Sequence, residues 1–222
     1  TEYAVDFWRP AGEIYKLNHE NVQFEMLDLA NRSNIEHVIK NLAGKFDVLV
    51  GGPPCQGFST LGKRRDDDAR STLVDVFAEI AVRSQPPIIL MENVKGIASK
   101  KHPSGGTFLE SFCHKLSYPE YSNLIGYYVS HQELVATDFG MAQTRKRMFT
   151  IAIRKDIPSS KNLLKEIWTI IESSKTKSHP NLKKVLAGLE TNPPVFGKLS
   201  DADSKKANAH LSMNHSAKLK ER

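Results

Sequence analysis

Short apolar runs alternate along this chain with longer stretches in which apolar residues recur every three or four positions. A short run that ends at Gly, Pro or polar residues predicts a buried strand, and the wider spacing predicts a helix with one apolar face. The predicted strands are residues 3–7, 22–27, 48–50, 88–91, 127–135 and 147–153. The predicted helices are residues 10–18, 35–42, 72–83, 108–116, 162–173 and 179–189.

This alternation of strands and helices favours an α/β fold, with a mostly parallel sheet that is covered by helices on both faces. The length of 222 residues suits one such domain, or one domain and part of another. The pattern changes after residue 155, and residues 200–222 are polar and basic, with little that forms a core. We therefore expect a first domain over residues 1–157, followed by linker helices and the start of a smaller region over 158–222.

Composition and charge narrow the classes of function only slightly. The formal net charge of +6 and a sequence pI of about 9.2 suit a polyanionic partner, although charge alone is weak support for one. No apolar run is long enough to cross a bilayer, and the first residues lack the pattern of a signal peptide. Two cysteines make no disulfide framework, which indicates a reducing compartment, and no Cys/His cluster has the spacing of a zinc site.

The segment Val48–Ser59 carries the most informative pattern. A predicted strand ends in two glycines and two prolines, and Cys55 follows directly. Successive prolines fix two φ angles and remove two backbone donors, so the turn is stiff. Ligands bind at the carboxyl ends of strands in open α/β sheets, which favours a reactive cysteine here. The alternative is a buried structural thiol, the usual state of a free cysteine.

Charged residues stand at the ends of other predicted strands. Asp6 and Asp28 end the first two strands about 20 residues apart, like the ribose and base contacts of a nucleotide-binding half-fold. From these residues alone, solvated loop acids are an equal alternative. Glu92 follows the strand 88–91, and Arg145 and Arg147 point the same way at the entrance of the last strand. The alternative for the arginines is a solvated basic edge.

Four segments together resemble the motifs of the cytosine-C5 DNA methyltransferases. In chain order they are Pro54-Cys55-Gln56, Arg70-x-x-Leu73, Glu92-Asn93-Val94 and Gln143-x-Arg145-x-Arg147. Each is weak alone, but their order and their places at strand ends make the match specific. The resemblance covers roughly Val5–Ile153, and Asn192–Arg222 is more loosely similar to the start of that family's target-recognition domain. The resemblance implies a Rossmann-like methyltransferase fold. It also implies an enzyme that uses S-adenosylmethionine and acts on double-stranded DNA.

The resemblance also implies covalent catalysis on a cytosine that is flipped out of the double helix. Cys55 is then the nucleophile that adds to C6 of the ring, after which C5 accepts a methyl group from S-adenosylmethionine. Glu92 donates to N3, and Arg145 or Arg147 holds O2, with Arg145 as the family's first choice. Preorganised donors aimed at developing charge are usually the largest source of transition-state stabilisation.

Further residues match the family's cofactor and DNA contacts. Asp6 matches the acid that binds the ribose, Phe7 the residue that stacks on adenine, and Asp28 and Leu29 the contacts to the adenine edge. The remaining residues expected to bind the cofactor are Pro53, Pro54, Leu73 and Asn93. The residues expected to bind DNA are Gln56, Ser59, Lys63, Arg64, Arg65 and Gln143.

Two parts of the family's pattern do not occur in this sequence. One is the Gly-rich turn after a first strand, which binds the methionine part of the cofactor. The other comprises most of the target-recognition domain and the C-terminal motifs. Three explanations stay open: a trimmed chain, a circular permutant, or one half of a split enzyme. In the last case we expect a second chain as a further partner that supplies the absent parts. The expected location is the cytoplasm or nucleoid of a bacterium, or the nucleus of a eukaryote.

Three other functions stay open at this point. The branch of the fold that methylates tRNA is a close relative, although Gly57-Phe58-Ser59 resembles the DNA type. A non-catalytic DNA- or cofactor-binding subunit of a split enzyme has no need of Cys55, Glu92 and both arginines. A thiol hydrolase or redox enzyme needs a histidine or a second cysteine beside Cys55, and no segment obviously supplies either.

Overall fold

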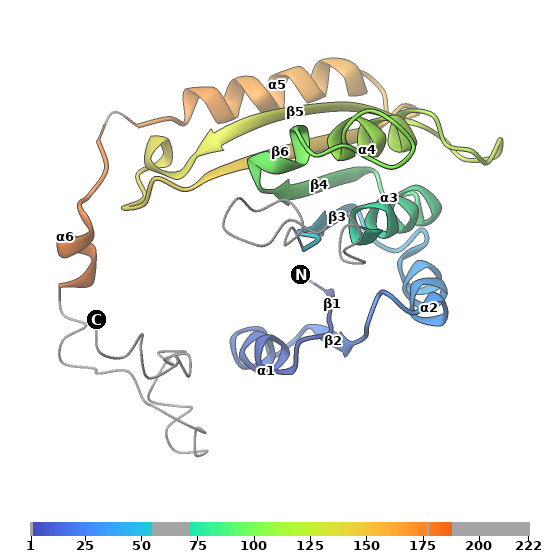
Figure 1. Cartoon of the computed structure of the whole chain (residues 1–222), viewed down its shortest axis with the longest axis horizontal. Helices are drawn as coiled ribbons and strands as arrows, with labels where there is room; N and C mark the ends of the chain where they lie inside the picture. Colours follow the sequence, from blue (N-terminus) through green and yellow to red (C-terminus); the bar gives the residue numbers. More distant parts are fainter. Residues whose placement is uncertain (1, 55–71, 177, 188–222) are drawn as a thin grey trace.

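The computed structural model describes residues 2–54, 72–176 and 178–187 (Figure 1). The strands are β1 (Tyr3–Asp6), β2 (Gln23–Met26), β3 (Val48–Gly51), β4 (Ile88–Asn93), β5 (Tyr127–Val135) and β6 (Lys146–Arg154). The α-helices are α1 (Arg9–Asn18), α2 (Arg32–Leu42), α3 (Thr72–Ser84), α4 (Phe108–Ser117), α5 (Ser160–Ser173) and α6 (Leu182–Leu186). Two short 3-10 helices are η2 (Lys95–Ala98) and η3 (Ala136–Phe139). Every strand and helix predicted from the sequence is present, with ends displaced by a few residues.

The described strands form two sheets. β1 pairs in parallel with β2, and a second sheet has the order β3-β4-β6-β5. β3 and β4 are parallel, as predicted, but β6 is antiparallel to both β4 and β5. For the β5–β6 pair the reason is the short connection of residues 136–145, because a parallel pair needs a longer crossover. The fold is therefore α/β with a mixed sheet, and its antiparallel part lies at one edge.

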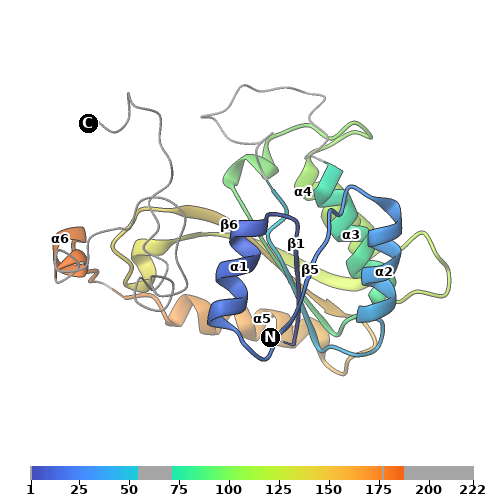
Figure 2. The same cartoon turned by 90° about the horizontal axis from the view of Figure 1, so that it is seen from below.

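Helices cover both faces of the four-stranded sheet, which is visible in Figures 1 and 2. Ile89 and Met91 of β4 face a core that α3 and α4 close. Leu90, between them, faces the opposite core, where Leu164 and Trp168 of α5 are buried. Alternate residues of one strand thus serve the two cores, as the pleat requires. Although α5 falls in the region predicted as linker helices, it is packed against this sheet.

A third apolar cluster joins α2 to α3 and to the strands beside them. Ile35, Val38 and Ile39 of α2 are buried against Ile80 of α3, and side chains of β1 and β3 pack on the same cluster. Asn31 caps the start of α2, since its side chain accepts from the Ser33 amide at 2.9 Å. This cap explains why the helix begins before the first apolar residue of the predicted segment.

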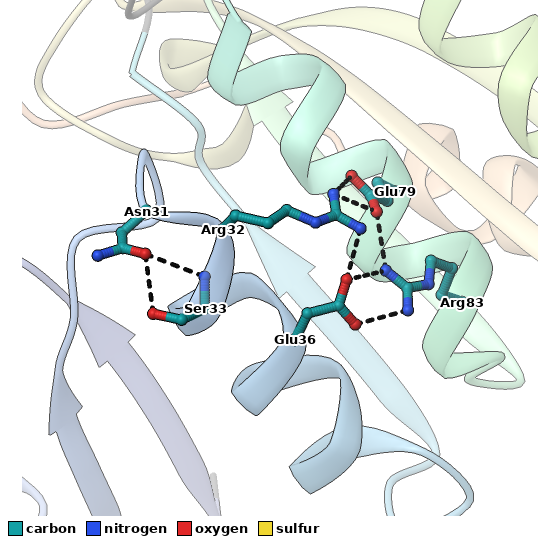
Figure 3. Close-up of polar contacts among 6 residues, drawn as sticks. All are labelled: Asn31, Arg32, Ser33, Glu36, Glu79 and Arg83. Atoms are coloured by element: carbon teal, nitrogen blue, oxygen red, sulfur yellow. Dashed lines mark hydrogen bonds and ion pairs between the residues drawn. The ribbon is translucent and has the colours of Figure 1, made fainter.

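Four charged side chains cross between the same two helices (Figure 3). Arg83 of α3 donates to Glu36 of α2 at 2.6 Å and to Glu79 at 2.9 Å, and Arg32 also reaches Glu79 at 2.7 Å. The hydrogen bonds from Arg83 and Arg32 lower the pKa of Glu36 to about 2. This network holds α2, and with it β1 and β2, against α3. No helix in the described part of the chain is long and apolar enough to cross a membrane.

Candidate active site

The carboxyl ends of β3 and β4 lie side by side because the two strands are parallel and Gly51 pairs with Met91. The turn that leaves β3 at Gly52 is therefore adjacent to Glu92. A Cβ atom on Gly52 would lie 3.9 Å from Oε2 of Glu92. The structure thus brings the ends of β3 and β4 to one edge of the sheet, as the sequence predicted. Glu92 lies at this edge, and the chain leaves β3 there towards Cys55.

The antiparallel strand β6 begins beside this edge and brings Arg147 to it. Glu92 pairs with Phe149, so Arg147 occupies the diagonal position on the same face of the sheet. Its Nε atom lies 2.8 Å from Oε1 of Glu92, and its Nη1 donates to the Lys146 carbonyl at 2.8 Å. The Arg147 side chain is largely buried, whereas the Glu92 carboxylate is partly open to solvent. The pair can thus present hydrogen-bonding groups to a polar ring.

The other residues of the Gln143–Arg147 segment lie differently. Arg145 and Gln143 are exposed, and Arg145 makes no ion pair with any described residue. Its backbone carbonyl accepts from the Ala136 amide at 2.9 Å, which closes the connection between β5 and β6. The structure therefore brings Glu92 together with Arg147, and leaves Arg145 in solvent.

Asn93 is almost completely buried, with 1% of its surface exposed. Its Nδ2 donates to the Pro53 carbonyl at 3.2 Å, and its Oδ1 accepts from the Val94 amide at 2.9 Å. Pro53 and Pro54 are partly buried beside it. The sequence singled Asn93 out for the cofactor, but its link to Pro53 could not be read from the sequence.

The ends of β1 and β2 form a second group of predicted residues. Oδ1 of Asp6 accepts from the Trp8 amide at 2.8 Å, and Oδ1 of Asp28 accepts from the Ala30 amide at 2.9 Å. The Asp6 carbonyl also accepts from the Leu27 amide, which ties the two strand ends together. Both carboxylates are exposed, and no described residue bonds the second oxygen of either, which can accept from hydroxyl or amine donors.

Apolar side chains accompany these two acids. Phe7 is 63% exposed, and Leu29 packs on the cluster between α2 and α3. Trp8 is also exposed, although the sequence analysis did not single it out. The sequence does contain a signal for Trp8, because this second aromatic residue directly follows Phe7. An exposed aromatic ring next to Asp6 in the sequence suits a ligand with a flat ring and hydroxyl groups.

Close packing positions the carboxyl end of β3. A Cβ atom on Gly51 would lie 2.2 Å from the Phe77 ring, so α3 approaches the strand where only glycine fits. Leu73, one turn earlier on α3, is partly buried. Other predicted residues lie outside the part of the chain that the structure describes: Cys55, Gln56, Ser59, Lys63, Arg64 and Arg65.

Comparison with known proteins gives matches to Type II methyltransferases. The chain is 35% identical over 149 residues to the Type II methyltransferase M.AgeI of Thalassovita gelatinovora, covering 66% of this chain and 33% of that protein. It is 33% identical over 171 residues to the Type II methyltransferase M.DdeI of Desulfomicrobium norvegicum, covering 77% of this chain and 39% of that protein. The chain thus spans little more than a third of the length of these relatives.

Solved structures support the fold. A prophage-encoded protein of E. coli, described as a candidate DNA modification methyltransferase, superposes with a TM-score of 0.62 at 24% identity. That match covers 90% of this chain and 52% of the other. A mutant of DNMT2 from Spodoptera frugiperda superposes with a TM-score of 0.52 at 25% identity, covering 70% and 43%. The family model for C-5 cytosine-specific DNA methylases matches residues 1–221, and the chain therefore belongs to that family.

Proposed function

We propose that this chain carries the catalytic part of a DNA cytosine-5 methyltransferase that acts on double-stranded DNA. Membership of the family and the Type II methyltransferases among its relatives support this reaction. The observation that carries the proposal is the Glu92–Arg147 pair, which lies beside the turn that leads into Cys55. We divide the chain as the sequence suggests, with catalysis in residues 1–157, and linker helices and the start of target recognition in 158–222. Within the second region, α5 packs on the sheet of the first.

In the proposed mechanism the target cytosine leaves the base stack, because C5 and C6 are inaccessible inside a duplex. The Cys55 thiolate adds to C6, and the electron pair of the C5–C6 double bond moves to C5, which becomes nucleophilic. Charge that develops on N3 and O2 meets the proton of a protonated Glu92 and the guanidinium of Arg147. After C5 is methylated, a base removes the C5 proton, and the double bond re-forms as Cys55 leaves.

The geometry favours Arg147 over Arg145 as the group that holds O2. Arg147 already contacts Glu92, so one ring can meet both side chains, whereas Arg145 is exposed. We assign Arg145 and Gln143, with the basic residues Lys63, Arg64 and Arg65 and the neighbouring Gln56 and Ser59, to contacts with the DNA. Exposed arginines beside a catalytic edge suit phosphate contacts, which give affinity without sequence information.

The residues at the ends of β1 and β2 fit S-adenosylmethionine. Asp6 and Asp28 offer free carboxylate oxygens to ribose hydroxyls and to the adenine amine, and the exposed Phe7 ring offers a stacking surface. When bound, the cofactor supplies an electrophilic methyl group. Leu29, Pro53, Pro54 and Leu73 complete the proposed lining. We propose the cytoplasm or nucleoid of a bacterium as its location, because the organisms of the matched relatives are bacteria.

Covalent capture tests the proposal directly. The protein is incubated with S-adenosylmethionine and duplex DNA that carries 5-fluorocytosine, and the products are separated on a denaturing gel. Fluorine cannot leave C5 as a proton does, so we expect a stable protein–DNA adduct that is lost in Cys55→Ser. An adduct in Cys55→Ser equal to that of the unaltered protein would refute the mechanism. A parallel reaction with fluorinated tRNA would assign the RNA reaction instead if only that substrate reacted.

We further propose that the free edge of β3 pairs with a strand from a second chain. Among the described strands β3 has a neighbour on one side only, and Val48 and Val50 on it are 49% and 65% exposed. Exposed apolar edge strands favour pairing with another segment. We expect Val50→Lys to weaken association with that chain in sedimentation experiments, because charge protects an edge. Unchanged association would refute this partner surface.

A further inference from the structure

Asn93 connects the two strand ends of the proposed active site from inside the protein. Its Nδ2 donates to the Pro53 carbonyl and its Oδ1 accepts from the Val94 amide. Both polar atoms of the amide are thus hydrogen-bonded, in a residue that is 1% exposed. A buried amide in this state stabilises a single arrangement, because loss of either partner leaves a polar group without water. The arrangement that it stabilises is the position of the β3 turn relative to the end of β4.

Among the described residues, few other contacts fix the β3 turn to β4. The ladder between β3 and β4 ends at Gly51 and Met91. Pro53 and Pro54 have no amide hydrogen and cannot donate to a neighbouring strand. The Pro53 carbonyl is thus held to β4 by a side chain rather than by the ladder. Cys55 follows two residues after this carbonyl in the sequence.

Asn93 and Glu92 serve opposite faces of the same strand. Successive side chains of a strand point to opposite sides, so Glu92 faces Arg147 while Asn93 faces the interior with Met91. A displacement of the Pro53 carbonyl relative to Asn93 therefore changes the distance between the turn and the Glu92 carboxylate. Reacting groups that are misplaced by about 1 Å lose on the order of 100-fold in rate.

We infer that Asn93 is a positioning residue, which through Pro53 sets the place of the turn at residues 52–54, the turn that precedes Cys55 in the sequence, relative to Glu92. This inference rests on the proposed function, in which Cys55 and Glu92 act on one cytosine. It gives Asn93 a task within the protein in place of the cofactor contact that the sequence suggested. Asn93 does not touch the reacting atoms in this role, and acts on them through the turn.

Asn93→Asp separates the two hydrogen bonds. The carboxylate still accepts from the Val94 amide, but its second oxygen repels the Pro53 carbonyl instead of donating to it. We expect kcat to fall by about 10-fold or more, with KM for DNA changed by less than about 3-fold. We expect the rate at which iodoacetamide alkylates Cys55 to change with it, measured by mass spectrometry on the protein without substrate.

The pH dependence gives a further readout. A buried carboxyl group takes up a proton more readily than an exposed one, and the protonated form regains a donor for Pro53. The kcat of Asn93→Asp, divided by the kcat of the unaltered protein at the same pH, should therefore rise as the pH is lowered from about 8 to about 6. The kcat values are referred to folded protein, so that a change in the folded fraction alone would leave this ratio constant. Cys113 serves as the reference thiol, because burial raises its pKa to about 11 and keeps it unreactive.

Ser84→Ala is the matched control, since it also removes a buried hydrogen bond, from Oγ to the Ile80 carbonyl at 2.7 Å. Ser84 ends α3 and precedes the start of β4, whereas Asn93 ends β4. Replacing Ser84 should therefore leave kcat unchanged. Asn93→Ala, which adds no charge, replaces Asn93→Asp if that variant fails to fold, and should show the same loss of kcat. A normal kcat in both, or a raised cofactor KM with normal kcat, would overturn the inference. Methylation by Cys55→Ser would instead overturn the proposed function itself.

Discussion

Nε of Arg147 lies 2.8 Å from Oε1 of Glu92, although the two residues are far apart in the chain and belong to different strands. The contact follows from the antiparallel register of β4 and β6, which pairs Glu92 with Phe149 and places Arg147 diagonally on the same face. Arg145, two residues earlier, precedes β6 and is exposed. Two arginines of one short motif therefore have different environments, and we expect different consequences when each is replaced.

Arg147→Ala should lower kcat by about 100-fold, the typical loss when one donor to a developing charge is removed. It should also free the Glu92 carboxylate, which loses the ion partner that orients it. Arg145→Ala should leave kcat within about 3-fold and weaken DNA binding, with a smaller dependence of affinity on salt. Single-turnover methylation and binding titrations at several salt concentrations separate the two effects. The opposite pattern, a kcat loss confined to Arg145→Ala, would return the O2 contact to Arg145.

The contrast between these arginines shows where the sequence was informative. Period-two and period-three-to-four patterns depend on local residues, so the strand ends that carry Glu92 and Asp6 could be predicted. The Glu92–Arg147 contact depends on a register between strands more than 50 residues apart, which periodicity does not encode. The amide of Asn93 was equally hidden, because its partner is a backbone carbonyl on another strand.

The same limit applied to the direction of the last two strands. Alternating strands and helices suggested a parallel sheet, but only the short connection before β6 reveals the antiparallel pair. The helix at α5 was predicted from the spacing of its apolar residues. That Leu164 and Trp168 are buried against the sheet depends on the face of the sheet to which Ile151 and Ile153 of β6 point. Tertiary contacts therefore decided what local patterns left undetermined.

Gly51→Ala should destabilise the protein by about 1–3 kcal/mol, the usual range for overpacking. The added methyl would lie 2.2 Å from the Phe77 ring, which is stacked on Phe112 and has little space to move. Thermal unfolding should show a midpoint lowered by roughly 2–4 °C for each kcal/mol. Gly52→Ala is the control, because among the described residues its Cβ would approach only Oε2 of Glu92, at 3.9 Å. Equal midpoints for the two variants would contradict the close approach of α3.

The network between α2 and α3 should make stability depend on acidic pH. Hydrogen bonds from Arg83 lower the pKa of Glu36 from its ordinary 4.5 to about 2 in the folded protein. A lowered pKa means that the unfolded chain binds the proton first, so the contribution is complete above about 4.5 and is lost as the pH falls towards about 2. Glu36→Gln should therefore be less stable at neutral pH and change less over this window. Urea unfolding at a series of pH values measures both, and parallel curves for the two proteins would contradict the assignment.

Thr150→Val should stabilise the protein. Thr150 lies on β6 with 1% of its surface exposed, and among the described residues its hydroxyl has no hydrogen-bond partner. A buried hydroxyl without a partner costs about 1–3 kcal/mol, and valine fills nearly the same space without a polar atom. We expect a gain of about 1 kcal/mol, seen as a higher urea midpoint with an unchanged slope. Thr169→Val on α5 is the matched control, because that hydroxyl is exposed and already donates to the Lys165 carbonyl. A loss of stability in Thr150→Val would mean that the hydroxyl has a partner, such as a buried water, which valine cannot keep.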